Sequence, residues 1–195
     1  MSSELKEHRE HLEDLVRERT ERLTEAVDQL RATNRELEDA RRIMNYDMSL
    51  AANVQESFLV GPPPNDPEWE IALHYAPMSS VSGDFYDFFT DNSGRLLGLS
   101  LMDVSGHGVA SGLITMIGKL ICHRVFFQNT QRNIGETLAH INDELIQEIG
   151  SLDNYVTGIM LKFTDSGIEY VNAGHTDLLL ADSNGTVRSI GSEDG

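Results

Sequence analysis

Two aspartates stand beside strand-like apolar runs, where a hydrophobic core would ordinarily begin. Asp84 follows a glycine and precedes the aromatic run FYDFF, and Asp103 directly follows the apolar run LLGLSLM. A strand would therefore deliver each carboxylate to the end of a sheet. Two hard oxygen ligands on neighbouring strands, beside a loop with free carbonyl groups, match the ligand preference of Mg²⁺ or Mn²⁺. Asp87 is a weaker candidate ligand in the same stretch.

The same aspartates have a purely structural interpretation of equal weight at this point. Asp and Ser are common N-cap residues, and the segment SGHGVASG opens a helix. A zinc site is disfavoured, because the single thiol, Cys122, lies in an apolar run and the 7 histidines are scattered. Local pattern alone leaves helix caps and metal ligands both open.

The turn DVSGHGVASG allows other chemistry. Gly106 and Gly108 permit a close backbone approach, so a phosphate on backbone N–H groups is one interpretation. The loop lacks a Walker lysine, and the order G-x-S-x-G of a nucleophile elbow is absent. His107 is either a general acid or simply a polar loop residue, and His175, which ends the turn NAGH, has the same weak standing.

The elements that must position these residues change in composition and hydrophobic pattern near residue 60. Residues 1–60 contain no glycine and no proline, and VGPPP must end their helix. Beyond it, WEIALHYAPM alternates like a strand, GDFYDFF and RLLGLSLMDV are strand-like, and two helical segments follow. The remainder reads as short strands joined by tight turns, an antiparallel meander. This order predicts an α+β fold, a layered sandwich of antiparallel sheets flanked by helices.

The N-terminal helix carries a heptad seam. Two rows of residues recur at a spacing of seven and define d and a positions. The seam residues are Leu23, Val27, Leu30, Asn34, Leu37, Met44 and Met48. Asn34 at an a position favours a parallel dimer in one register, whereas Arg41 weakens the seam. A single amphipathic helix along its own domain is the alternative, and the persistence of the pattern favours the parallel homodimer.

Composition excludes several classes of protein. The net charge of −17 in 195 residues argues against nucleic acid or an anionic membrane as the main partner. A single cysteine gives no disulfide framework, and we expect a buried thiol. We expect a cytoplasmic chain without membrane contact, since no apolar window approaches the roughly 20 residues of a span and the N-terminus lacks a signal-peptide pattern.

An ordered set of motifs resembles one phosphatase family. The segments ANVQESFL, SGDFYDFF, MDVSGHGVASGL, NDEL, YVTGIMLKF and NAGHTDLLL resemble the SpoIIE-type (RsbU-like) branch of the PPM metal-dependent protein phosphatases. The resemblance implies two antiparallel sheets between helix pairs and a pair of Mn²⁺ or Mg²⁺ ions. It implies that Asp84 and Asp103 are metal ligands and that Asp103 bridges both ions. It also implies that the carbonyl of Val104 completes the ligand shell of one ion. It implies that a metal-activated water attacks a phosphoserine or phosphothreonine phosphorus in line.

The resemblance also implies partners. Substrates of the family are commonly anti-sigma-factor antagonists, and helical linkers often join an upstream sensor domain to the phosphatase. We therefore expect residues 1–60 to be a coiled-coil linker and dimerisation helix, and residues 61–195 to be the N-terminal portion of a PPM-type domain. The dimeric linker would transmit a signal through helix register or crossover.

One departure from the family pattern is serious. The family supplies further aspartates from later strands, and this sequence stops at SIGSEDG before they could occur. We expect a C-terminally truncated domain with weak metal binding and little turnover. A catalytically silent dimeric scaffold is the alternative function, and a metal-dependent enzyme of nucleotidyl cyclase type is a more remote one.

Overall fold

The computed structural model describes residues 2–59, 61–77 and 81–191. The final stretch of the sequence, including Asp194 and Gly195, lies outside the described residues. The chain forms two compact units, Met1–Asp47 and Met48–Gly195. The first unit is helical, and the second contains all of the strands.

The N-terminal helix is continuous, as predicted. Helix α1 runs over Ser2–Leu59 and ends just before Gly61 and the three prolines that follow. Exposed ion pairs between residues three or four positions apart lie along it, such as Arg22 with Glu18. Its last turns belong to the second compact unit, where Leu59 is fully buried.

The second unit is built on a four-stranded antiparallel sheet in the order β1-β2-β3-β4. The strands are β1 (Asp84–Thr90), β2 (Leu96–Val104), β3 (Val156–Thr164) and β4 (Gly167–Ala173). Two further strands, β5 (Leu178–Ala181) and β6 (Val187–Ile190), pair only with each other and form a separate hairpin. The expectation of one continuous meander was therefore wrong between β4 and β5, and the α+β fold of antiparallel sheets with helices is confirmed.

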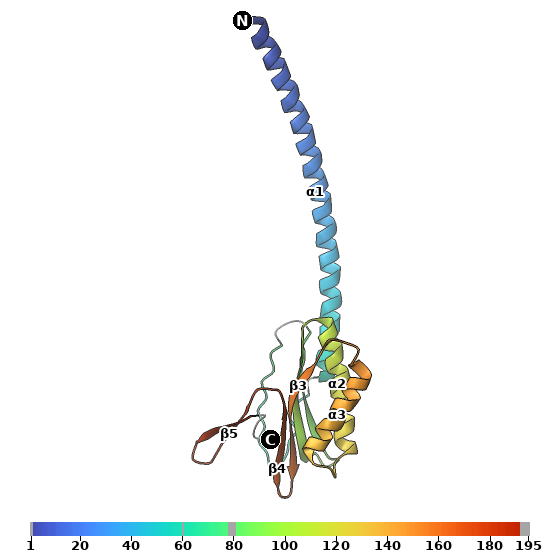
Figure 1. Cartoon of the computed structure of the whole chain (residues 1–195), viewed down its shortest axis with the longest axis vertical. Coiled ribbons are helices and arrows are strands. Elements are labelled where there is room, and N and C mark those ends of the chain that lie inside the picture. The colour runs from blue at the N-terminus through green and yellow to red at the C-terminus, as the bar shows by residue number, and fades with distance from the viewer. Residues whose placement is uncertain (1, 60, 78–80, 192–195) are drawn as a thin grey trace. The chain divides into compact units, whose positions relative to one another are not determined.

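Two helices cover one face of this sheet, as Figure 1 shows. Helix α2 (Val109–Gln128) is apolar nearly all round and packs on β1 and β2, and beside it α3 (Ile134–Ile149) packs on β3 and β4. Helix α3 is amphipathic, and the side chain of its N-cap Asn133 accepts a hydrogen bond from the Glu136 amide. The core lies between these layers, where Phe89 and Phe126 stack with ring centroids 4.0 Å apart.

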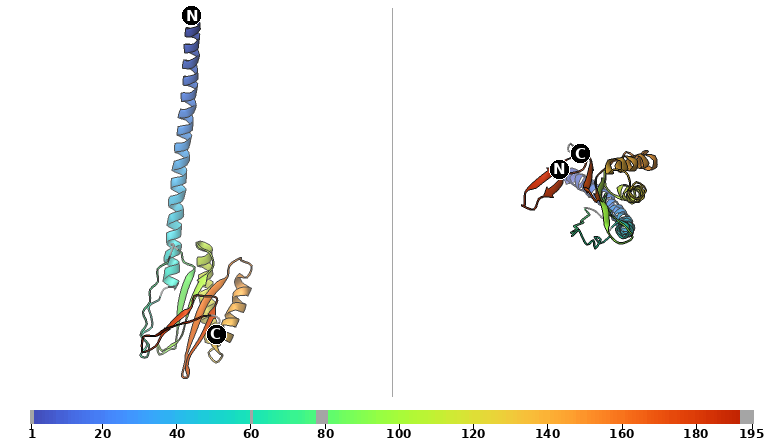
Figure 2. Two further views of the ribbon diagram at one scale, coloured as in Figure 1. Left: turned by 60° about the vertical axis from the view of Figure 1, so that its left-hand side comes forward. Right: turned by 90° about the horizontal axis from the view of Figure 1, so that it is seen from below.

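The β5–β6 hairpin and the extended residues 61–77 lie on the opposite side of the sheet from the helices (Figure 2). The strand predicted for WEIALHYAPM is absent over residues 69–77. Its alternation instead reflects one-sided contact. Trp69 packs against Phe163, and the Tyr75 ring meets Tyr86 at 5.8 Å. Alternation of apolar residues here accompanies contacts with one face of the sheet and does not show that the backbone joins a ladder.

Helix α2 also corrects the expectation about apolar windows. By length and composition alone this helix could cross a membrane, and half of it is buried inside the domain. Its buried residues face the sheet and α3, and include Ile114, Ile121 and Val125. The apolar composition therefore has an explanation in the core of this domain.

Candidate functional site

The two predicted aspartates come together at one end of the sheet. Asp84 begins β1, Asp103 lies near the end of the antiparallel β2, and the two are direct partners in the strand register. Their neighbours Phe85, Met102 and Val104 are buried on the helical face, so both carboxylates lie on the opposite face. The residues that the sequence separates by nineteen positions are thus side by side.

The helix-cap interpretation of these aspartates is excluded. Helix α2 begins at Val109, its N-cap is Gly108, and no side chain caps it. Asp103 and Asp84 are both strand residues. Neither carboxylate therefore has the capping role that local sequence allowed.

Oxygen atoms converge around Gly83. A Cβ at this position would lie 2.7 Å from the carbonyl oxygen of Val104, and 3.6 Å from both Asp103 Oδ1 and the carbonyl oxygen of Gly106. Glycine is therefore required here, because a side chain would meet the backbone. The amide of Val104 donates to the carbonyl of Gly83 at 3.0 Å and fixes this approach. The result is a cradle of hard oxygen atoms beside the aspartate pair.

The loop that follows Asp103 is held by two residues just before β3, Asn154 and Tyr155. The amide of Ser105 donates to the Tyr155 carbonyl at 2.8 Å, and the Asn154 side chain donates to the Ser105 carbonyl at 2.7 Å. Gly106 and Gly108 both have positive φ, 92° and 87°, which only glycine adopts easily. His107 between them is exposed. The loop is rigid in its backbone, and it presents His107 to solvent.

His175 lies at the same end of the sheet. Its Nδ1 is 3.1 Å from the hydroxyl of Thr157, which is the register partner of Asp103 on β3. Asn172 accepts from the His175 amide at 2.8 Å, and Gly174 has the positive φ of a turn residue. The predicted turn NAGH is thus confirmed. Each strand, β1 to β4, or the turn after it, contributes one polar residue to this end: Asp84, Asp103, Thr157 and His175.

The electrostatics of the site follow from this packing. Burial raises the pKa of Asp84 above its ordinary value, and the neighbouring Asp103 carboxylate adds to the rise by charge repulsion and a hydrogen bond. His175 is close enough to act in the opposite direction. Two carboxylates that repel each other are an arrangement that a bound cation would relieve.

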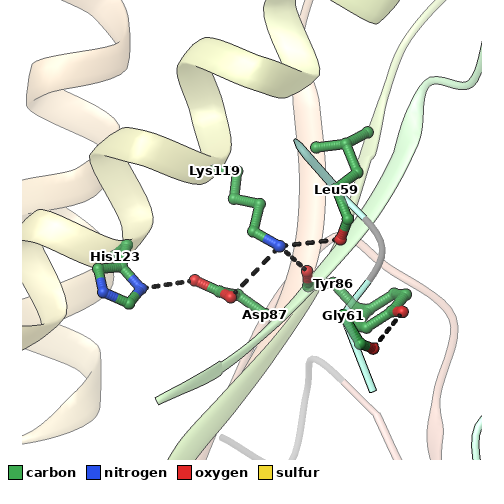
Figure 3. A network of polar contacts seen from close by, with 6 residues as sticks. All are labelled: Leu59, Gly61, Tyr86, Asp87, Lys119 and His123. Atoms are coloured by element: carbon green, nitrogen blue, oxygen red, sulfur yellow. Dashed lines mark hydrogen bonds and ion pairs between the residues drawn. The ribbon is translucent and has the colours of Figure 1, made fainter. Parts of the chain in front are cut away.

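Asp87 does not join this pair, and its candidacy as a ligand was wrong. It lies three residues after Asp84, so its side chain points to the helical face, where it is buried. There Lys119 Nζ lies 3.4 Å and His123 Nδ1 lies 2.8 Å from its oxygens. Lys119 also donates to the carbonyl of Leu59 at 2.8 Å, and Figure 3 shows this network joining α1, β1 and α2.

Sequence reasoning missed the role of Gln55. This residue of α1 is buried, and its side-chain nitrogen lies 2.8 Å from the carbonyl of Ser82 and 3.1 Å from that of Gly112. Its side-chain oxygen accepts from the Ser82 amide at 2.8 Å. The Ser82 hydroxyl in turn accepts from the Asp84 amide at 3.0 Å. The signal in the sequence was a polar residue at an a position of the heptad, directly after the seam.

The donor set fits a hard divalent cation in part. Among the described residues no cluster of three or more His, Cys, Asp or Glu side chains is suited to hold a metal ion. The cradle around Gly83 nevertheless offers carbonyl and carboxylate oxygens, the atoms that Mg²⁺ and Mn²⁺ prefer, and Mg²⁺ usually keeps several waters.

Comparison with known proteins gives the family of the chain. Residues 93–195 match the family described as Stage II sporulation protein E (SpoIIE). The chain belongs to the SpoIIE family. This match includes Asp103, the glycine loop, Thr157 and His175, whereas Asp84 lies before it.

One curated SpoIIE relative is the "Phosphoserine phosphatase RsbP" of Bacillus subtilis (strain 168), 34% identical over 151 residues. The alignment covers 72% of this chain and 35% of RsbP. The solved SiaA-PP2C domain of Pseudomonas aeruginosa superposes with a TM-score of 0.59 at 15% identity, covering 78% of this chain and 61% of that chain. This likeness shows that the SpoIIE chain has a PP2C-type fold. The chain spans about a third of the length of RsbP.

Proposed function

We propose that this chain is the N-terminal part of a metal-dependent phosphatase domain that removes phosphate from phosphoserine or phosphothreonine on a regulatory protein. The observation that carries the proposal is the facing pair Asp84–Asp103 beside the oxygen cradle at Gly83. Membership of the SpoIIE family and the phosphoserine phosphatase name of RsbP support the reaction class.

In this function the residues of the chain would hold the metal ions and orient the phosphoryl group. When bound, a pair of Mn²⁺ or Mg²⁺ ions would lower the pKa of a water and neutralise phosphoryl oxygens. Asp103 and Asp84 would hold the ions through carboxylate oxygens, and the carbonyl of Val104 would add a ligand. Gly106 and Gly108 leave the backbone open beside them, so that a phosphoryl group has room to approach.

The proposed substrate is a phosphoprotein of the anti-sigma-factor antagonist type, and we propose that the chain acts in the cytoplasm. The second half of the chain is strongly acidic, which disfavours nucleic acid. A phosphate group on a protein would meet this acidic surface only where cations neutralise it. The site, and not the surface as a whole, therefore decides where phosphate binds.

The first experiment measures Mn²⁺ binding by electron paramagnetic resonance together with phosphate release from a phosphoserine protein. We expect weak Mn²⁺ binding and slow release, both abolished in Asp103→Asn. Asp165→Asn is the matched control, because Asp165 is fully exposed in the β3–β4 turn. Activity or Mn²⁺ binding that survives Asp103→Asn would contradict the assignment.

A catalytically silent regulatory module is the second candidate. It is favoured by the small number of carboxylates that the described residues bring to the site. Such a module would bind Mn²⁺ and dimerise, yet release no phosphate even at high protein concentration. The same two measurements separate the candidates, since only the phosphatase gives Mn²⁺-dependent release.

We further propose that α1 is a dimeric linker that conveys a signal from an upstream sensor domain. The d-position residues Leu23, Leu30, Leu37 and Met44 are 61–65% exposed in the single chain, and a parallel partner would bury them. Contacts at the end of α1 support a route to the site. Gln55 holds Ser82 at both its amide and its carbonyl, and Ser82 holds the Asp84 amide.

A further inference from the structure

His175 is half-buried beside the aspartate pair and is held on two sides. Its amide donates to the Asn172 side chain at 2.8 Å, and its Nδ1 lies 3.1 Å from Thr157 Oγ1. The Asn172 side chain donates to the carbonyl of His175 at 3.3 Å and to the hydroxyl of Tyr170 at 3.0 Å. A turn residue with this many restraints is oriented, not merely exposed.

The contact with Thr157 restrains the ring at Nδ1. When the Thr157 hydroxyl donates to Nδ1, the ring proton is on Nε2, which is then a hydrogen-bond donor. Thr157 is the register partner of Asp103, so this contact fixes the ring relative to the carboxylate pair. His175 is also close enough to Asp84 for their charges to interact, so the ring lies beside the carboxylate pair.

A phosphoryl group at this site needs donors, and three basic side chains of the sheet and helix layers, Lys119, Lys162 and Arg124, are engaged elsewhere. Lys119 is bound to backbone carbonyls and Asp87 on the helical face of the sheet. Lys162 donates to two carbonyls in the loop after α2, and Arg124 pairs with Glu144 between the two helices. A histidine N–H that meets a phosphate oxygen makes a charge-assisted hydrogen bond, stronger than a neutral one.

We propose that His175 is a positioning residue for the phosphoryl group, donating from Nε2 to an oxygen of the phosphate that a divalent cation at Asp84 and Asp103 would hold, with Thr157 setting its tautomer. This inference rests on the proposed function. It assigns His175 no place among the metal ligands.

The test uses the whole chain with ¹⁵N-labelled histidine, loaded with Mg²⁺ and titrated with inorganic phosphate. Ring ¹H–¹⁵N correlations should show His175 as the Nε2–H tautomer, and phosphate should shift its Nε2 resonance. His140 is the internal control, because it is also half-buried with a hydrogen-bonded Nδ1 but lies on α3. A His175 resonance that stays unmoved at phosphate saturation would overturn the proposal.

Variants give the second readout. Loss of a hydrogen bond to a charged group should weaken phosphate binding about tenfold in His175→Gln. Thr157→Val should weaken phosphate binding about threefold. Without the Thr157 hydroxyl both ring tautomers are populated, and only the one with its proton on Nε2 can donate to phosphate. Mg²⁺ affinity should stay at the wild-type value in both, and His140→Gln should change neither. Wild-type phosphate affinity in His175→Gln would refute the role of His175 alone, whereas a wild-type chain that binds no Mg²⁺ would overturn the proposed metal site as well.

Discussion

Aspartates of one chemical type behave differently in this chain because the fold gives each a different set of neighbours. Asp66 accepts backbone hydrogen bonds from Leu96 at 2.6 Å and from Glu68 at 2.7 Å. Asp87 is paired with Lys119, and Asp84 faces another carboxylate. Only the last arrangement leaves negative charge without compensation, which is why it is the candidate for cation binding.

Asp66 should make stability depend on pH. Its backbone hydrogen bonds, that from Leu96 above all, lower its pKa below the ordinary 3.8. The charged carboxylate therefore stabilises the fold above that value, and the contribution is lost as pH falls through the lower folded-state pKa. Asp66→Asn should lower the free energy of unfolding at neutral pH, and the difference from wild type should shrink in acid. Urea titrations at both conditions measure it, and an equal difference in acid would contradict the prediction.

Cys122 should be chemically inert in the folded chain. Burial in the core, with the Asp87 charge adding to it, raises the pKa of this thiol to about 12. The reactive thiolate is then scarce at neutral pH, and the sulfur is inaccessible. A thiol reagent such as DTNB should fail to label the native chain and should label one thiol after denaturation. Rapid labelling of the native chain would show that α2 does not pack as described.

At the scale of elements, Gln55 fastens the end of α1 to the strand that carries Asp84. Gln55→Ala would leave the Ser82 amide and the carbonyls of Ser82 and Gly112 without this partner in a buried place. We expect a loss of about 3 kcal/mol in the free energy of unfolding. Glu56→Ala, an exposed neighbour on the same helix, should change it by less than about 0.5 kcal/mol. Equal effects of the two changes in a urea titration would argue against the fastening role.

Asp87 and Lys119 connect β1 with α2, and Lys119 reaches the last carbonyl of α1 (Figure 3). Lys119→Met would leave the mostly buried Asp87 with His123 as its remaining side-chain partner, and should destabilise the chain by about 3 kcal/mol. The double variant with Asp87→Asn should recover more than about 1 kcal/mol of that loss, because the buried carboxylate that has lost its lysine partner is replaced by a neutral amide. A double-mutant cycle by thermal or urea unfolding measures this coupling, and strict additivity would show that the pair does not interact.

At the scale of the whole molecule, Asn34 should set the strength of the proposed dimer. A polar residue at an a position selects register and lowers stability, so Asn34→Leu should tighten self-association. Sedimentation equilibrium measures the dissociation constant, which should fall by about tenfold or more. Asn45→Leu, on the same helix but outside the seam, is the matched control. Equal association of Asn34→Leu and wild type would contradict the seam assignment.

The sequence alone determined much of this fold. The absence of glycine and proline before residue 60 required one long helix, and the change in periodicity after it required strands and two helices. These are local properties, because period and turn chemistry act over a few residues. The identity of Asp84 and Asp103 as candidates also came from sequence, since each adjoins an apolar run that a strand explains.

Only the tertiary structure decided which roles those residues have. The antiparallel register made Asp84 and Asp103 partners, and the strand pleat turned Asp87 to the other face. Residues 69–77 show the reverse case, where an alternating pattern made no strand. Three features depend on contacts between residues far apart in the chain. They are the strand register, the face of the sheet on which a side chain lies, and the buried hydrogen bonds of a residue such as Gln55. No local pattern encodes such contacts, so the choice between a helix cap and an oxygen cradle had to come from the fold.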